Sequence, residues 1–145
     1  MSAISSIETL KSVRPFFHRI GRRGGALLFL AFIDFVYAYS FAYPPKEILG
    51  APVFKFYNEI LPIKGWALIW LTVGIVCFIG AFFKRDAFSF ATAMMMKMIW
   101  GLVNLFSWFS GVDRGYLSAS VWFVFAGFLA ILAGWPEKEH RAESD

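Results

Sequence analysis

Two charged side chains, Asp34 and Lys97, lie in the middle of long apolar stretches of this sequence and are its best candidates for chemistry. Asp34 falls about ten residues into the stretch 24–43, and Lys97 falls about eleven residues into the stretch 87–110. A single Asp or Lys at the centre of a membrane-spanning helix costs about 2.5–3.5 kcal/mol. That cost falls if the two side chains pair, or if one of them is neutral.

Two uncharged polar residues share helical faces with this pair. Asn104 follows Lys97 by seven residues, which is two helical turns, and Tyr37 follows Asp34 by one turn. The four could form a polar seam for water, protons or a substrate, as in a small transporter that uses Asp34. They could equally be a structural pair that fixes helix register, with Asn104 bonded across helices. We favour the structural interpretation, because a transport pathway usually needs more than one acid.

Other chemistry is excluded by residue type. The chain has one cysteine, Cys77, and two histidines, His18 and His140, near opposite ends. These residues cannot build a metal site of the usual ligand count, and the sequence has no phosphate-binding loop, nucleophile elbow or dinucleotide fingerprint. We therefore expect no enzyme, no cofactor and no metal, with Cys77 as a packing residue.

These polar residues lie in two of four long apolar runs of the sequence. The 145 residues are 59% hydrophobic and 17% charged, against about 45–50% and about 25% in a soluble domain. Each run approaches the ~20 residues that a helix needs to cross a bilayer, and short links make neighbouring helices antiparallel. The sequence predicts an all-α membrane domain, a four-helix bundle over 24–135 with spans at 24–43, 65–83, 87–110 and 116–135.

Three segments lie outside these runs. Residues 1–23 read as a basic amphipathic helix bent at Pro15, or alternatively as a partly ordered tail. Between Pro52 and Pro62 a short amphipathic helix is expected in the membrane interface, the alternative being an irregular loop. Its apolar face would comprise Val53, Phe56, Tyr57, Ile60 and Leu61. Residues 136–145 form a polar tail.

Lys and Arg fall unevenly on the two sides of the predicted bundle. With the N-terminus inside, nine lie on the cytoplasmic side and four, Lys46, Lys55, Lys64 and Arg114, on the other. This bias predicts an inner (cell) membrane protein with both termini cytoplasmic. The first run is too long for a cleaved signal core of about 7–15 residues. The expected partner is anionic lipid rather than nucleic acid, with headgroup contacts at Arg14, Arg19, Arg22, Arg23, Lys84 and Arg85.

Small residues line one face of the second run and one face of the fourth. Such faces let helices pack closely, within one molecule or between copies in a homo-oligomer or larger membrane complex. The candidate packing residues are Gly74, Cys77 and Ala81 in the second run, and Gly127, Ala130 and Gly134 in the fourth.

The stretch RRGGALL at 22–28, which leads into an aromatic-rich run ending at Pro44 and Pro45, resembles small four-span membrane proteins of phages that infect actinobacteria. This resemblance covers the first third of the chain. It implies a phage-encoded protein of the host inner membrane, holin-like in that it would oligomerise and open lesions for lysis. The chain departs from the simplest holins, which have fewer spans and a strongly charged tail.

Three functions remain open from the sequence. The first is pore formation or lysis by assembly in the bilayer. The second is a non-catalytic accessory or exclusion protein that docks on a larger membrane complex. The third is a small transporter that uses Asp34.

Overall fold

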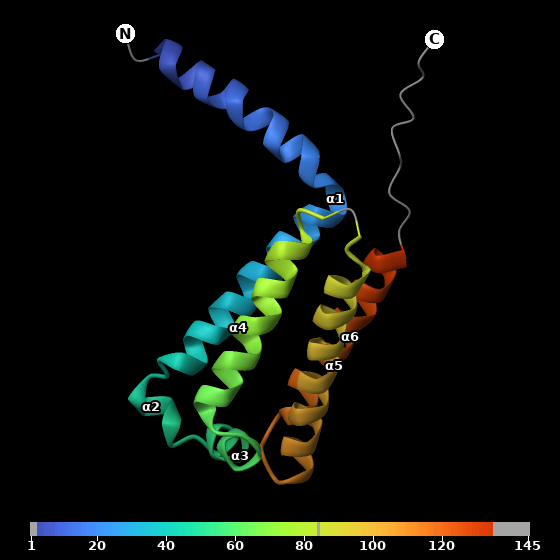
Figure 1. The fold of residues 1–145 in the computed structure, drawn as a ribbon. Helices are drawn as coiled ribbons and strands as arrows, with labels where there is room; N and C mark the ends of the chain where they lie inside the picture. The colour runs from blue at the N-terminus through green and yellow to red at the C-terminus, as the bar shows by residue number, and fades with distance from the viewer. Residues whose placement is uncertain (1–2, 84, 135–145) are drawn as a thin grey trace.

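The computed structural model describes residues 3–83 and 85–134, and residues 3–20 by their backbone only. Over these ranges the chain is all helical, with six helices and no strand (Figure 1). The helices are α1 (Ala3–Ala42), α2 (Lys46–Leu49), α3 (Pro52–Ile60), α4 (Ile63–Gly80), α5 (Ala87–Phe109) and α6 (Gly115–Gly134). The predicted tail at 136–145 lies outside the described residues.

Four of these helices are long and apolar enough to cross a membrane. They are residues Gly21–Ala42 of α1, and the whole of α4, α5 and α6. They match the four predicted runs to within a few residues, which confirms four long apolar helices. The helix α4 ends at Gly80 rather than at Phe83, because Phe82 and Phe83 belong to a turn with backbone bonds to Ile79 and Gly80. Hydropathy does not mark this end, because the turn residues are as apolar as the helix.

The long helices associate as two antiparallel pairs. The helix α1 packs along α4, α5 packs along α6, and α4 and α5 join the pairs (Figure 1). The beginning of the apolar part of α1 and the end of α6 lie at the same end of the bundle, where Arg23 donates to the carbonyl of Ala133 at 3.0 Å. The helix α3 and the loop 111–115 lie at the opposite end.

The helix α1 is interrupted at Gly21, where φ is 61° and ψ is 180°. This backbone conformation is essentially restricted to glycine, because a Cβ would clash. The break separates residues 3–20 from the apolar part of α1. It lies at Gly21 rather than at Pro15, where the sequence predicted the bend.

Prolines delimit the helices of the long link. Pro52 is the first residue of α3, and Pro62 precedes α4, positions that need no backbone N–H. Tyr57 is buried and Lys55 is exposed, which agrees with the predicted faces of α3. Ile60, predicted on the apolar face, is instead 50% exposed. Phe54, with its ring centroid 5.9 Å from that of Phe41, packs on the bundle in its place.

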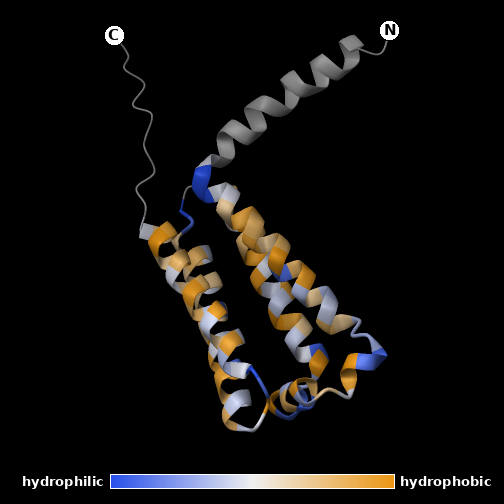
Figure 2. Ribbon diagram, turned by 180° about the vertical axis from the view of Figure 1, so that it is seen from behind, coloured by the Kyte–Doolittle hydropathy of each residue, from blue (hydrophilic) through white to orange (hydrophobic). Residues whose placement is uncertain are grey.

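The surface of the bundle is largely apolar, which is unusual for a soluble protein, and its hydrophobic interior also holds several polar groups. Phe88 and Val124 are each 74% exposed, whereas Asn104 and Ser107 are buried together with the central charged pair. Hydrophobic residues cover the long helices, and hydrophilic residues gather at their ends (Figure 2). This distribution is compatible with a multi-pass membrane protein.

The two predicted small-residue faces have different environments. Gly74 and Cys77 of α4 are buried, as is Ala81 directly after it, and a Cβ at Gly74 would lie 2.7 Å from the Phe35 ring of α1. The α4 face therefore permits close packing within the molecule. The α6 residues Gly127, Ala130 and Gly134 are all exposed.

Close backbone packing makes Gly115 the most constrained glycine of α6. A Cβ there would lie 2.7 Å from the Asn104 carbonyl oxygen and 2.9 Å from the Trp108 Cβ. We predict that Gly115→Ala lowers the free energy of unfolding in detergent by about 1–3 kcal/mol, because backbone atoms must shift.

The matched control is Gly127→Ala on the same helix, where nothing lies within 4 Å of the added Cβ. This change should leave the thermal midpoint unchanged or raise it slightly. Equal effects of the two substitutions would contradict the packing of α6 against α5.

Candidate functional site

Asp34 of α1 and Lys97 of α5 meet in the centre of the bundle. The Lys97 Nζ donates a hydrogen bond to the Asp34 Oδ1, and both side chains are 0% exposed. The contact predicted from their matched depth is therefore present. It joins two helices that otherwise touch little, since α1 packs mainly on α4 and α5 mainly on α6.

Aromatic rings and a thiol enclose this pair. The Lys97 Nζ lies 4.5 Å from the ring centroid of Trp70 and 5.9 Å from that of Trp122, within the range at which an ammonium is attracted to an indole face. The Cys77 Sγ lies 4.0 Å from the Asp34 Oδ2, so its weak S–H donor faces the carboxyl group. Cys77 thus borders the pair, a contact that the sequence analysis did not predict.

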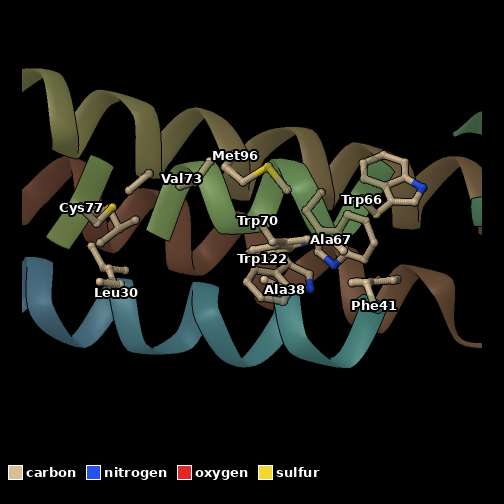
Figure 3. Close-up of a cluster of buried hydrophobic side chains, with 14 of the residues drawn as sticks. Leu30, Ala38, Phe41, Trp66, Ala67, Trp70, Val73, Cys77, Met96 and Trp122 are labelled. Carbon is tan, nitrogen blue, oxygen red and sulfur yellow. The ribbon is translucent and has the colours of Figure 1, made fainter. Parts of the chain in front are cut away.

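A layer of aromatic side chains covers the pair on the side toward α3. Tyr37 stacks on Trp70 with ring centroids 4.6 Å apart and meets the edge of Trp122 at 5.4 Å. Trp100 packs against Trp70 at 5.5 Å and against Phe41 at 5.5 Å. Trp70 and Trp122 lie together at the level of Ala38 (Figure 3). The Trp70 Nε1 is the one buried side-chain polar atom in residues 21–83 and 85–134 without a hydrogen-bond partner.

Asn104 belongs to a separate polar group on the other side of this layer. Its Oδ1 accepts a 2.9 Å hydrogen bond from the Tyr57 hydroxyl of α3, and its Nδ2 donates to the Trp100 carbonyl at 2.8 Å. The bond across helices predicted for Asn104 is present, but its partner is α3 rather than a long helix. Burial raises the pKa of Tyr57 to about 12, so its hydroxyl stays a neutral donor at physiological pH.

The structure therefore divides the predicted polar seam into two parts. Asp34 and Lys97 form the enclosed pair, whereas Tyr37 and Asn104 line an open cleft of about 600 Å³. The aromatic layer lies between the pair and the cleft, because Tyr37 and Trp122 line the cleft and the charged pair does not.

The cleft is bounded by α1, α3, α5, α6 and the loop between the last two helices. Its aromatic lining residues are Tyr37, Phe41, Phe54, Tyr57, Trp100 and Trp122. Of its polar lining residues, Ser40, Asp113, Arg114 and Ser118 are exposed, whereas Asn104 and Ser107 are buried. The sequence does not predict the cleft, because α3 and the 111–115 loop contribute to it and periodicity does not determine their placement.

A second charged pair closes the opposite end of the bundle. Arg23 binds Asp86 with both its Nε (2.9 Å) and an Nη (2.6 Å), and it lies 5.1 Å from the Phe90 ring centroid. Together with its bond to the Ala133 carbonyl, this side chain joins the beginning of α5 and the end of α6 to α1. From the sequence, Arg23 was expected to contact only lipid headgroups, and Asp86 was not predicted as its partner.

The other predicted headgroup residues are less constrained by the structure. Arg22 and Arg85 are exposed. The side chains of Arg14 and Arg19, and the whole of Lys84, lie outside the described residues.

Within the described parts of the chain, no group of three or more His, Cys, Asp and Glu side chains could hold a metal ion. The enclosed pair offers one acid and one amine that bond to each other, an arrangement that holds helices in register. Comparisons with protein-family models, curated proteins and solved structures find no match.

The buried pair generates a double-mutant test. Asp34→Asn or Lys97→Met alone leaves one ionisable group buried without its partner, and each should lower the free energy of unfolding by about 3–5 kcal/mol. The double variant should lose less than the sum, which thermal unfolding in detergent would measure. Additive losses would mean that the two side chains do not interact.

Proposed function

We propose that this protein is a multi-pass membrane protein of a bacterial inner membrane, with α3 in the outer interface and both termini cytoplasmic. Its support is the outward apolar surface of four helices of sufficient length. The charge bias of the loops supports the orientation. Exposed Tyr39, Tyr43, Trp108 and Tyr116 near the α3 end match the aromatic residues that gather at headgroup level.

We further propose that the protein acts by association with copies of itself in the bilayer, and not by catalysis. The observation that carries this is the outward face of α6, which buries the smallest share of its residues among the four long helices. Gly127 and Gly134 lie on this face with nothing within 4 Å of an added Cβ. In lipid, small residues allow two helices to approach closely, so that dispersion contacts replace lipid contacts.

The distribution of polar groups favours assembly without a permanent hole. An aqueous pore needs a hydrophilic lining, but Asp34 and Lys97 bond to each other and Asn104 bonds to Tyr57. The outward faces of the long helices carry mainly apolar side chains, which would not line an aqueous pore between copies. This supports self-association without a pore over holin-like lysis, within the phage setting that the stretch at 22–28 suggests.

Association can be measured by energy transfer between donor- and acceptor-labelled copies in proteoliposomes. Gly127→Leu and Gly134→Leu should weaken it by about tenfold, which corresponds to 1.4 kcal/mol, because the larger side chains separate the α6 helices. The matched control is Gly25→Leu, an exposed glycine of α1 that also has nothing within 4 Å of an added Cβ.

Transfer that is absent in the wild type, or equally weak in all three variants, would overturn self-association through α6. Inducible expression in a bacterial host should leave the membrane potential intact. Depolarisation on expression would instead favour the holin-like alternative.

A further inference from the structure

The open cleft at the α3 end has the position and shape of a lipid site. It extends from the loop 111–115 to Trp122, and seven residues of helix from Gly115 span about 10 Å at 1.5 Å per residue. Its volume of about 600 Å³ lies in the range of about 300–1,000 Å³ usual for small-molecule sites. In the proposed membrane orientation, its mouth is at the headgroup level and its floor is at the depth of acyl chains.

The cleft opens sideways between α1 and α6. Ser40 of α1 and Ser118 of α6 both line it and are both exposed. The aromatic contact between these two helices is deeper, where Tyr37 meets Trp122. A molecule in the surrounding bilayer could therefore enter between α1 and α6 without crossing the aqueous phase.

The rim carries one cation and one anion side by side. Asp113 and Arg114 are exposed and line the cleft, and neither side chain has a hydrogen-bond or ion-pair partner in the described part of the chain. Arg114 has φ 62°, a conformation that is uncommon for a residue with a Cβ. It directly precedes α6, so the positive end of that helix dipole lies beside the guanidinium.

We propose that the cleft binds one zwitterionic phospholipid of the outer leaflet, with an ethanolamine-type headgroup. The phosphate lies against the Arg114 guanidinium, which favours an anion through charge-assisted hydrogen bonds, beside the positive end of the α6 dipole. The ammonium donates to the Asp113 carboxylate. The upper part of one acyl chain lies along Phe41 and Trp122.

This charge pattern distinguishes the lipid from its neighbours in the membrane. A purely anionic headgroup would satisfy Arg114 but would be repelled by Asp113. A headgroup that carries both charges can bind Arg114 through its phosphate and Asp113 through its ammonium, so a zwitterionic lipid is favoured over an anionic one.

The test is native mass spectrometry of the full chain in detergent, titrated with phosphatidylethanolamine or phosphatidylglycerol. The wild type should retain one phosphatidylethanolamine and prefer it over phosphatidylglycerol. Arg114→Gln should weaken binding of both lipids by about tenfold, as expected for one lost charge-assisted bond. Asp113→Asn should remove the preference, because it weakens phosphatidylethanolamine binding and relieves the repulsion of phosphatidylglycerol.

Two further variants make the outcome decisive. Ser118→Trp fills the cleft without changing its charge and should abolish retention of the lipid. Lys64→Gln removes an exposed cation at the same end of the bundle that does not line the cleft, and it should change nothing. Equal lipid binding in all variants, or an equal loss in the Lys64 variant, would overturn the site.

The inference rests on the proposed membrane location, which carbonate extraction of membranes tests separately. Protein released by carbonate would refute the membrane location. Protein that stays in the membrane, yet binds lipid independently of Arg114 and Asp113, would refute the lipid site alone.

Discussion

The contact between Lys97 and Asp34 holds the two helix pairs together at the centre of the bundle. Neither group can be left unpartnered in an apolar interior, because there is no water to solvate it. The two residues come from α1 and α5, which belong to different helix pairs. Their contact therefore fixes the axial register of one helix pair relative to the other. This register determines which side chains of the two pairs face each other.

The small residues and the aromatic rings follow from this register. Gly74 brings α4 close to α1 beside Asp34, so that Cys77 borders the carboxyl group. Trp70 and Trp122 then cover the amine, and Tyr37 stacks across Trp70. The pair is sealed from the cleft by rings rather than by charged groups, which supports a structural role over a transport pathway.

The sequence was informative where a single physical rule decides the outcome. Run length predicted the four long apolar helices, and the cost of unpartnered groups in lipid predicted that Asp34 and Lys97 meet. It was uninformative where partners come from links. Tyr57 reaches Asn104 only because α3 folds under the bundle, and Arg23 reaches Asp86 only because the α4–α5 turn returns to α1. Neither contact leaves a periodic pattern in the sequence. The sequence therefore predicted one polar seam, whereas the structure has an enclosed charged pair and a separate cleft.

The most direct test is a solid-state NMR measurement of the distance between lysine Nζ and aspartate Cγ in lipid. The chain would carry ¹⁵N at lysine Nζ and ¹³C at aspartate Cγ. Lys97–Asp34 is the one contact between a lysine and an aspartate within the described residues. Because Lys97 and Asp34 are in contact, we expect one strong dipolar coupling that disappears in Lys97→Met. No coupling in the wild type, or one that persists in the variant, would contradict it.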